Sequence, residues 1–382
     1  MCYNTPMFFE NLKTLKERRL FREINDRASS QGPKIKISGK EYVNFSSNDY
    51  LGLANHPYII NKVKKTLDDY GYGSAASRLL CGGSNLHREL EDRIARFKCT
   101  ESALVFNSGY AANTGIIPAI ADGDTVLFSD EFNHASIIDG CRLSKVKVLI
   151  YKHKDSLHLK DLIKKEKAKK KIVITDTVFS MDGDIAPLSD IYDICKKNNA
   201  ILYIDDAHGT GVLGNGRGAL SHFNISPEPS IVQMGTFSKA LGSYGAFVAG
   251  SRDVIEWILN TARSFIFSTA LPPCIVAGSI AALELIEKDS ELIKRLWLNR
   301  TNIAECIKDI GYNIMGSETP IIPLKTGTVE DTLRISRHLF EKDIFAPAIR
   351  PPTVTEPRIR ITVTAAHTDD DIGRLIEALR KV

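Results

Sequence analysis

The central part of the chain repeats a short apolar run, a polar loop and a stretch with helical periodicity. The apolar runs are not interrupted by alternating polar residues, which is typical of strands covered by helices on both faces. This alternation predicts an α/β domain with a mostly parallel sheet between layers of helices. The runs are "SALVF" (102–106), "TVLF" (125–128), "KKIVITDTVFS" (170–180), "AILYID" (200–205), "SIVQMG" (230–235) and "GAFVAG" (245–250).

The flanking regions predict smaller units. Residues 8–28 have apolar positions at helical spacing, and 34–38 and 41–45 predict a small hairpin around a glycine turn. A long helical stretch near 273–310 leads to a smaller C-terminal unit of α+β type. We therefore expect an N-terminal helix and hairpin (1–47), a large α/β domain (48–285) and a small α+β domain (286–382).

The composition is that of an ordinary soluble globular protein. Apolar residues make up 43% of the chain and charged residues 25%, and the formal net charge is +4. This balance gives no indication of nucleic acid or an anionic membrane as a partner. The basic run at 164–171 is explained by a solvated helix end. No apolar run reaches the ~18 residues of a membrane span, and we expect no secretory leader at the N-terminus.

The cysteines argue against a disulfide framework and against a zinc site. Their number, seven, is odd, and no pair has the C-x-x-C spacing, so we expect no metal. Cysteines of this kind fit a reducing compartment, and we expect a cytoplasmic location. They lie at positions 2, 81, 99, 141, 195, 274 and 306.

Polar side chains follow the carboxyl ends of the apolar runs, the edge at which ligands bind in such sheets. They are Gly109 and Tyr110 after the first run, His134 after the second, Ser180 at the end of the third, Asp205 at the end of the fourth and His208 just after it. Each of these residues also has a structural explanation that needs no ligand: a βα turn, a surface histidine, or a serine that ends a strand. The adjacent acids Asp205 and Asp206 are harder to explain without a ligand, because burying a carboxylate is costly unless it has a cationic partner.

One glycine-rich motif matches a binding pattern for a different cofactor, but its position in the sequence argues against that cofactor. The sequence "GTGVLG" (209–214) matches the G-x-G-x-x-G pattern of dinucleotide-binding proteins. That fingerprint lies directly between a strand and a helix. Here Asp-Asp-Ala-His intervenes and no apolar helix follows, so we do not expect a nicotinamide cofactor.

Lys239 cannot be explained as part of a solvated helix face. It lies in "GTFSKALGSYGA" (235–246), among small residues, which would let a bulky group approach its amine. Burial lowers the pKa of a lysine and makes it able to form a Schiff base. A phosphate-bearing aldehyde would use every group above, with its phosphate on Gly109, Tyr110 and Thr236, an aspartate on its ring nitrogen and a histidine on its ring face. These groups together indicate pyridoxal 5′-phosphate.

Several long motifs, in this order along the chain, resemble those of the α-oxoamine synthases, which are fold-type I pyridoxal-phosphate transferases. They are "NFSSNDYLGL", "GSAASRLLCG", "FNSGYAAN", "DEFNHAS", "FSMDGD", "DDAHGTGVLG", "GTFSKALGSYGA" and "RIRITVTAAHT". The resemblance runs from about residue 12 to the C-terminus. Members of this family condense an amino acid with an acyl thioester and release CO₂. The resemblance implies a mostly parallel, seven-stranded sheet between helices in the large domain. It also implies a homodimer with active sites at the subunit interface.

The resemblance implies a role for each candidate residue. Lys239 would bind the cofactor aldehyde, and after its release would act as the general base. Asp205 would pair with the pyridine nitrogen, and His134 would stack on the ring and orient substrate. His208 and Ser180 would reach the phenolic oxygen, Gly109 and Tyr110 would lie beside the cofactor, and Thr236 would contact its phosphate. On the substrate side, Arg360 would pair with the α-carboxylate, and Asn48 would lie in a neighbouring loop.

Within the family, the loop "AIRPPTV" (348–354) resembles the branch that forms 8-amino-7-oxononanoate, a biotin precursor. That branch condenses L-alanine with pimeloyl-CoA or a pimeloyl carrier protein. Arg350 and Thr353 in this loop, and Arg22 in "LFREI", are therefore candidate contacts for the acyl substrate. The alternatives are a glycine C-acetyltransferase and, from a different class, a catalytically silent partner subunit. The presence of Lys239 argues against the silent subunit.

Overall fold

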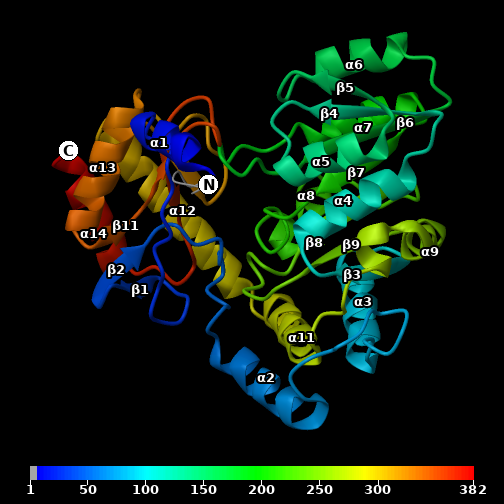
Figure 1. The fold of residues 1–382 in the computed structure, drawn as a ribbon, viewed down its shortest axis with the longest axis horizontal. Coiled ribbons are helices and arrows are strands. Elements are labelled where there is room, and N and C mark those ends of the chain that lie inside the picture. Colours follow the sequence, from blue (N-terminus) through cyan, green and yellow to red (C-terminus); the bar gives the residue numbers. More distant parts are fainter. Residues whose placement is uncertain (1–6) are drawn as a thin grey trace, which may run out of the picture.

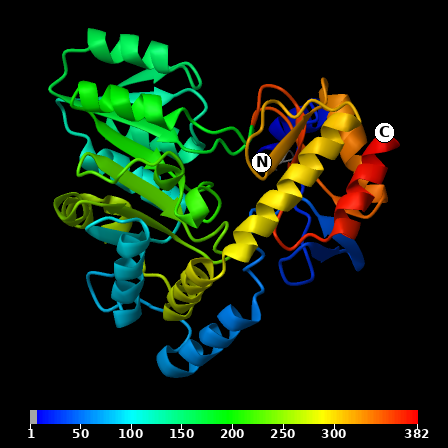
Figure 2. The same cartoon turned by 180° about the vertical axis from the view of Figure 1, so that it is seen from behind.

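The computed structural model describes residues 7–382, which form a sheet domain and a smaller unit that carries the C-terminus. In Figure 1 the sheet domain lies on the right, and the smaller unit, together with the N-terminal segment, lies on the left. Figure 2 shows from behind how the long helix α12 (Ser290–Asp309) runs from the junction along the smaller unit. Residues 1–6, and with them Cys2, fall outside the described part of the chain.

A seven-stranded sheet is the centre of the larger domain. Its strand order is β3-β9-β8-β7-β6-β4-β5, and all neighbours are parallel except β9, which is antiparallel to β3 and β8. The predicted fold class, a mostly parallel sheet with a smaller α+β unit, is confirmed. The strands are β3 (Ser102–Phe106), β4 (Thr125–Asp130), β5 (Lys147–Tyr151), β6 (Lys170–Asp176), β7 (Ile201–Asp205), β8 (Ile231–Thr236) and β9 (Ala246–Gly250).

Helices cover both faces of this sheet, which explains why its inner strands are apolar throughout. Val105 of β3 belongs to the buried cluster on one face, and its neighbour Leu104 belongs to the cluster on the other. On the first face lie α3 (Asn85–Phe97), α6 (Ser156–Lys165), α7 (Leu188–Lys197), α8 (Ala219–His222) and α11 (Pro273–Lys288). On the second face lie α4 (Gly109–Ile120), α5 (Ala135–Ser144), α9 (Arg252–Thr261) and α10 (Arg263–Ile266).

The smaller unit combines the two ends of the described chain. Strands β10 (Ile321–Lys325), β13 (Arg358–Thr362) and β12 (Ala348–Ile349) form one sheet, packed with α12, α13 (Val329–Glu341) and α14 (Asp369–Arg380). The predicted hairpin is present as β1 (Lys34–Ile37) and β2 (Lys40–Asn44), and β11 (Ile344–Phe345) pairs with β2 in parallel. The domain boundaries expected at residues 47 and 285 stay a prediction.

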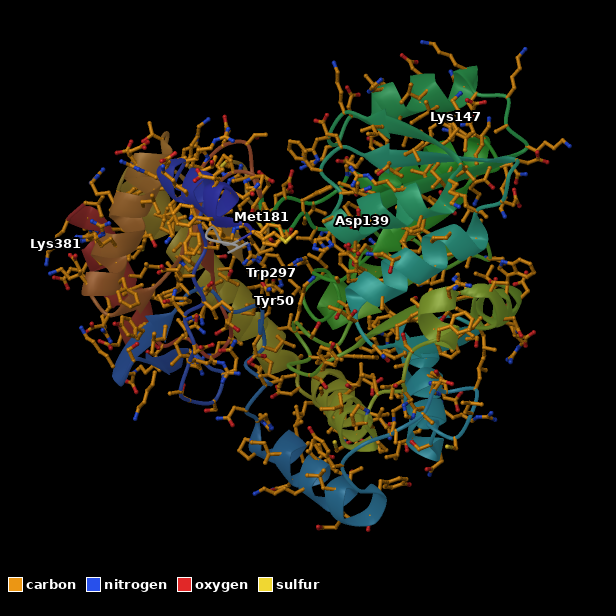
Figure 3. The ribbon with its side chains drawn as sticks, in the orientation of Figure 1. Tyr50, Asp139, Lys147, Met181, Trp297 and Lys381 are labelled. Atoms are coloured by element: carbon orange, nitrogen blue, oxygen red, sulfur yellow. The ribbon has the colours of Figure 1, made fainter. Side chains whose placement is uncertain are left out.

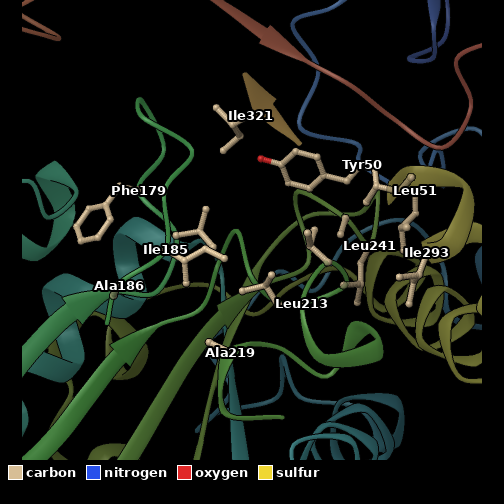
Figure 4. Close-up of a cluster of buried hydrophobic side chains, with 14 of the residues drawn as sticks. Tyr50, Leu51, Phe179, Ile185, Ala186, Leu213, Ala219, Leu241, Ile293 and Ile321 are labelled. Carbon is tan, nitrogen blue, oxygen red and sulfur yellow. The ribbon is translucent and has the colours of Figure 1, made fainter. Parts of the chain in front are cut away.

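A continuous apolar core joins the two parts. Figure 4 shows Tyr50, Leu241 and Ile293 together with side chains of both parts, such as Leu213 and Ile321. The loop after β6 also crosses the junction: the Gly183 carbonyl accepts the backbone N–H groups of Glu318 and Thr319, and Asp182 pairs with Arg358 at 2.5 Å. The edge of the sheet that ends near this loop is therefore held against the smaller unit.

Two predicted helices differ from the structure. The helix expected over 8–28 is α1 (Phe9–Glu17), which ends early because it has no buried residue to extend its packing, and Arg19 takes a left-handed φ of 56°. The stretch 273–310 is two helices, α11 and α12, since Asp289 leaves helical geometry and its side chain caps Glu291. Two further helical elements are α2 (Pro57–Tyr70) and η1 (Gly214–Gly216). The motif "GTGVLG" forms turns rather than a strand-to-helix loop.

Between residues 7 and 382 we find no helix whose length and hydropathy would let it cross a bilayer.

Candidate active site

A cavity of about 190 Å³ opens at the carboxyl edge of the central sheet. Every residue predicted to contact the cofactor borders it, and so do several that the sequence did not single out. Its lining consists of Gly109, Tyr110, His134, Ser136, Asp176, Ser180, Asp205, Ala207, His208, Met234, Thr236, Ser238 and Lys239. Parallel strands bring their carboxyl ends to the same edge, which is why residues spread over 130 positions meet here.

Lys239 reaches the cavity from a tight loop after β8. Gly242 in this loop has a φ of 61°, and a Cβ there would lie 2.3 Å from the Ala54 nitrogen. Ala240 packs equally closely on Gly211, where a Cβ would lie 2.4 Å from the alanine's own Cβ. The small residues around Lys239 are therefore required by backbone segments that pass next to the loop. They fix the lysine's position without occupying the cavity in front of it.

Asp205 is held as an acceptor by two N–H donors. The Asn113 side chain donates to its Oδ2 at 2.7 Å, and the Ala207 backbone donates to its Oδ1 at 3.0 Å. Asn113 is fully buried and is itself oriented by the Tyr203 hydroxyl, which donates to it at 2.6 Å. Hydrogen bonds of this kind stabilise the ionised carboxylate. The carboxylate therefore suits a protonated ring nitrogen.

The same Asn113 links Asp205 to His134. Its amide also donates to the Ser136 hydroxyl at 2.8 Å, and this oxygen lies 2.7 Å from Nδ1 of His134. His134 is the N-cap of α5, and its side chain accepts the Ser136 backbone N–H. The histidine and the aspartate are therefore positioned by one hydrogen-bond network.

The surroundings of the basic groups at the cavity lower their pKa values. Burial lowers the pKa of Lys239, although negative charge on Asp205, or on Asp176 when it is ionised, acts in the opposite direction. Burial also lowers the pKa of His134 and, more strongly, that of His208. A neutral amine with a lowered pKa is the form of lysine that attacks an aldehyde.

Arg360 supplies a buried positive charge next to the cavity. The guanidinium donates to the Ser180 carbonyl at 2.6 Å, to the Thr362 hydroxyl at 2.8 Å and to the Asn48 side-chain oxygen at 3.1 Å. All three acceptors are neutral, and within residues 7–382 no acidic side chain pairs with it. Because an unpaired buried charge is costly, this arrangement favours an anionic ligand, and a carboxylate matches the guanidinium geometry.

Comparison with known proteins identifies the family. The profile of the family described as aminotransferase class I and II matches residues 40–379. The chain belongs to this family.

Relatives within the aminotransferase class I and II family agree with the resemblance to the α-oxoamine synthases. The chain is 53% identical to a putative 8-amino-7-oxononanoate synthase of Thermodesulfovibrio yellowstonii, over 98% of this chain and 96% of that protein. It is 46% identical to the 8-amino-7-oxononanoate synthase of Thermoanaerobacter pseudethanolicus, over 98% and 95%.

Solved structures of family members superpose closely on this chain. A serine palmitoyltransferase of S. paucimobilis with a bound PLP–myriocin aldimine has a TM-score of 0.93 and 27% identity, covering 98% of this chain and 96% of that one. An 8-amino-7-oxononanoate synthase of Francisella tularensis has a TM-score of 0.78 and 29% identity, covering 89% and 97%.

The three residues expected to contact the acyl substrate form a separate cluster in this family member. The Arg22 guanidinium donates to the Thr353 hydroxyl at 2.8 Å. Arg350 donates to the backbone carbonyls of Arg19 and Phe21, each at 2.8 Å. The cluster ties the extended segment after α1 to the loop of β12. Among the described residues, none of these contacts involves a residue that lines the cavity.

The sequence reasoning missed Tyr50 and Asp176, which complete the site. Tyr50 lies between the two parts of the molecule in Figure 3, and its hydroxyl is 2.6 Å from Nδ1 of His208. Asp176 was not recognised as the end of a strand, because the predicted strand extended to Ser180, whereas β6 ends at Asp176. Ser180 instead lies in the loop beyond the strand. The rule that polar residues at strand ends face the ligand would have found Asp176.

Proposed function

We propose that this chain is an acyltransferase that condenses L-alanine with a pimeloyl thioester. The products would be 8-amino-7-oxononanoate, CO₂ and free CoA or carrier protein, a reaction of biotin biosynthesis. The observation that carries the proposal is one cavity that combines a buried lysine with a lowered pKa, an aspartate that accepts two N–H donors and an adjacent arginine that has no acidic partner within residues 7–382. The names of the relatives support the choice of substrates.

The residues of the cavity fit pyridoxal 5′-phosphate. Lys239 would hold the aldehyde carbon and Asp205 would hold the proton on the ring nitrogen. The start of α4 at Gly109, with the hydroxyls of Thr236 and Ser238, suits a phosphate. A side chain at position 109 would be crowded, because its Cβ would lie 3.1 Å from Cε of Met234. When bound, the cofactor supplies an electron sink for the carbanion at the α-carbon of the amino acid.

The chain's own residues would then bind and orient the amino acid. Arg360 would hold the α-carboxylate, and Asn48 would orient the guanidinium through the bond seen at 3.1 Å. The freed amine of Lys239 would accept the α-proton, and its lowered pKa favours the unprotonated form that this step requires. His134 would cover the ring face, while Ser180 and His208 would face the phenolic oxygen.

We propose that Arg22, Arg350 and Thr353 contact the acyl thioester. The two guanidinium groups are at least partly exposed, and Thr353 is exposed as well. Arg350 already uses two donors on backbone carbonyls, so it fixes the loop, while Arg22 and Thr353 present polar atoms to a ligand. A carboxylate or phosphate of the acyl substrate would suit this cluster.

We also propose that the protein is a homodimer in the cytoplasm. Large apolar side chains are exposed close to the cavity: Tyr110, which lines it, is 50% exposed, and Tyr244, in the loop after Lys239, is 54% exposed. Leu80 (80%) and Phe267 (70%) lie on two adjoining segments that Ser77 and Thr269 bridge. Exposed apolar patches of this kind mark association surfaces, and a second copy would bury them.

The test is an assay of the purified protein loaded with pyridoxal 5′-phosphate, with the product identified by mass. We expect 8-amino-7-oxononanoate from L-alanine with a pimeloyl thioester and no significant turnover of glycine with acetyl-CoA. The reverse preference would assign the chain as a glycine C-acetyltransferase. A colourless protein that does not take up the cofactor would indicate a silent partner subunit.

A further inference from the structure

Asp176 and Asp205 form a pair of buried carboxyls at the floor of the cavity. They end the neighbouring parallel strands β6 and β7 and are direct partners in the register of the sheet. Adjacent strands lie about 4.8 Å apart, and both residues line the cavity with 5% and 4% of their surfaces exposed. Two carboxylates this close and this buried cannot both ionise without a large repulsion.

The hydrogen bonds distinguish the two carboxyls. Both oxygens of Asp205 accept an N–H, from Asn113 and from Ala207. Asp176 accepts a single N–H, from the His134 backbone to Oδ2 at 2.7 Å, and within residues 7–382 its Oδ1 has no partner and no lysine or arginine pairs with it. Donors stabilise the ionised form, so the charge is favoured on Asp205.

The charges around Asp176 act in the same direction. Burial and the charge of Asp205 raise the pKa of Asp176 well above its usual value, and Asp130 at the end of β4 adds to this effect. The opposing influences are the hydrogen bond from the His134 backbone and the positive charge that Lys239 carries when it is protonated. Asp130 is itself paired with His153 at 3.0 Å.

We propose that Asp176 is a carboxylic acid in the resting site, and that as a positioning residue it keeps the amine of Lys239 unprotonated. An ionised Asp176 would raise the pKa of Lys239, as the carboxyl of Asp205 does. A neutral Asp176 leaves one negative charge, on Asp205, to match the single positive charge of a protonated ring nitrogen. The protonation of Asp176 is a property of the chain alone, whereas its consequence for the reaction rests on the proposed function.

The first test is infrared difference spectroscopy on the full-length chain purified without cofactor. At neutral pH we expect a carboxylic-acid C=O band that is lost in Asp176→Asn and kept in the matched control Asp130→Asn. If Asp176→Asn does not fold, Asp176→Glu serves instead, because it keeps the acid and shifts the frequency of the band. A wild-type spectrum without the band, or a band unaffected by changes at position 176, overturns the proposal.

The second test follows the pH dependence with which Lys239 captures pyridoxal 5′-phosphate, with Lys239→Ala as the blank. We expect Asp176→Asn to leave the apparent pKa of Lys239 unshifted, because it replaces one neutral group by another. A carboxylate at position 176 would instead make this substitution lower that pKa, and such a shift overturns the proposal. Neither measurement requires alanine or a thioester, so a failure of the proposed reaction would be recognised separately.

Discussion

Replacing Lys98 by methionine should destabilise the protein strongly, although Lys98 does not touch the cavity. Lys98 follows α3 and is buried with Asp206, each side chain only 1% exposed. Its ammonium group donates to Asp206 Oδ2 at 2.7 Å, to the Thr210 hydroxyl at 3.0 Å and to the Arg217 carbonyl at 2.7 Å. Methionine has a similar length and removes all three bonds with little change in volume.

The expected loss of stability depends on the hydrogen bonds that Asp206 retains in the variant. Removing one member of a buried ion pair costs about 3–5 kcal/mol, because the other charge stays buried without compensation. Asp206 would still accept from the hydroxyls of Thr177 and Thr210 and from the Ala219 N–H, which favours the lower end of that range. The Arg217 carbonyl would lose its ammonium donor, which adds about 1 kcal/mol. We expect a total loss near 4 kcal/mol.

The assay is urea unfolding of the full-length chain, followed by tryptophan fluorescence. Lys294→Met is the matched control, because Lys294 pairs with Glu291 on the surface, with 68% and 75% of the side chains exposed, and an exposed pair of this kind contributes little to stability. Combining Lys98→Met with Asp206→Leu should recover part of the loss, since no unpaired charge remains. A Lys98→Met variant as stable as its control would refute this reasoning.

Three further predictions concern the site and its surroundings. Lys239→Ala should abolish the visible absorbance of the bound cofactor together with turnover; a variant that keeps both would exclude Lys239 as the attachment point. Arg360→Gln should lower kcat/KM for the amino acid by about 10- to 100-fold, the value of a charge-assisted hydrogen bond, and leave KM for the thioester unchanged; an equal effect on both substrates would contradict the assignment. Burial alone would lower the pKa of His153, but Asp130 and Asp184 outweigh it and raise the pKa to about 9. The folded-state pKa is thus above the unfolded value near 6.5, so the stabilisation is complete below that pH and is lost as pH rises through about 9. Thermal unfolding of His153→Gln should lack this alkaline loss, and a wild-type-like profile would count against it.

The sequence predicted the parts of the fold that depend on continuous burial. Inner strands such as β6 and β7 stand out because both faces are covered by helices. β5 was not recognised because it is an edge strand, with Lys147 and Ile150 exposed, and lacks the unbroken apolar run. The end of α1 was missed for a related reason: helical spacing persists beyond Glu17, but no surface is available to bury the apolar positions.

The candidate site was predictable where residues lie at strand ends. Asp205 ends β7 and Lys239 lies in the loop that follows β8, and the structure brings them to one cavity. Asn113 lies inside a helix and Tyr50 in an N-terminal loop, and their roles depend on contacts with Asp205 and His208 from distant parts of the chain. Such partners follow from tertiary packing, which local patterns do not encode.

Because β2 pairs with β11, the small sheet that they share with β1 can be completed only after β11 has been synthesised. Val43 leaves the ribosome about 300 residues before its partner Ile344, a delay of roughly 15–60 s at 5–20 residues per second. During that interval β1 and β2 form only a two-stranded hairpin, which is marginal in water, and the edge of β2 that β11 later pairs stays open. The first-made strands of the smaller unit therefore remain unpaired on that edge until the segment that contains β11 has emerged.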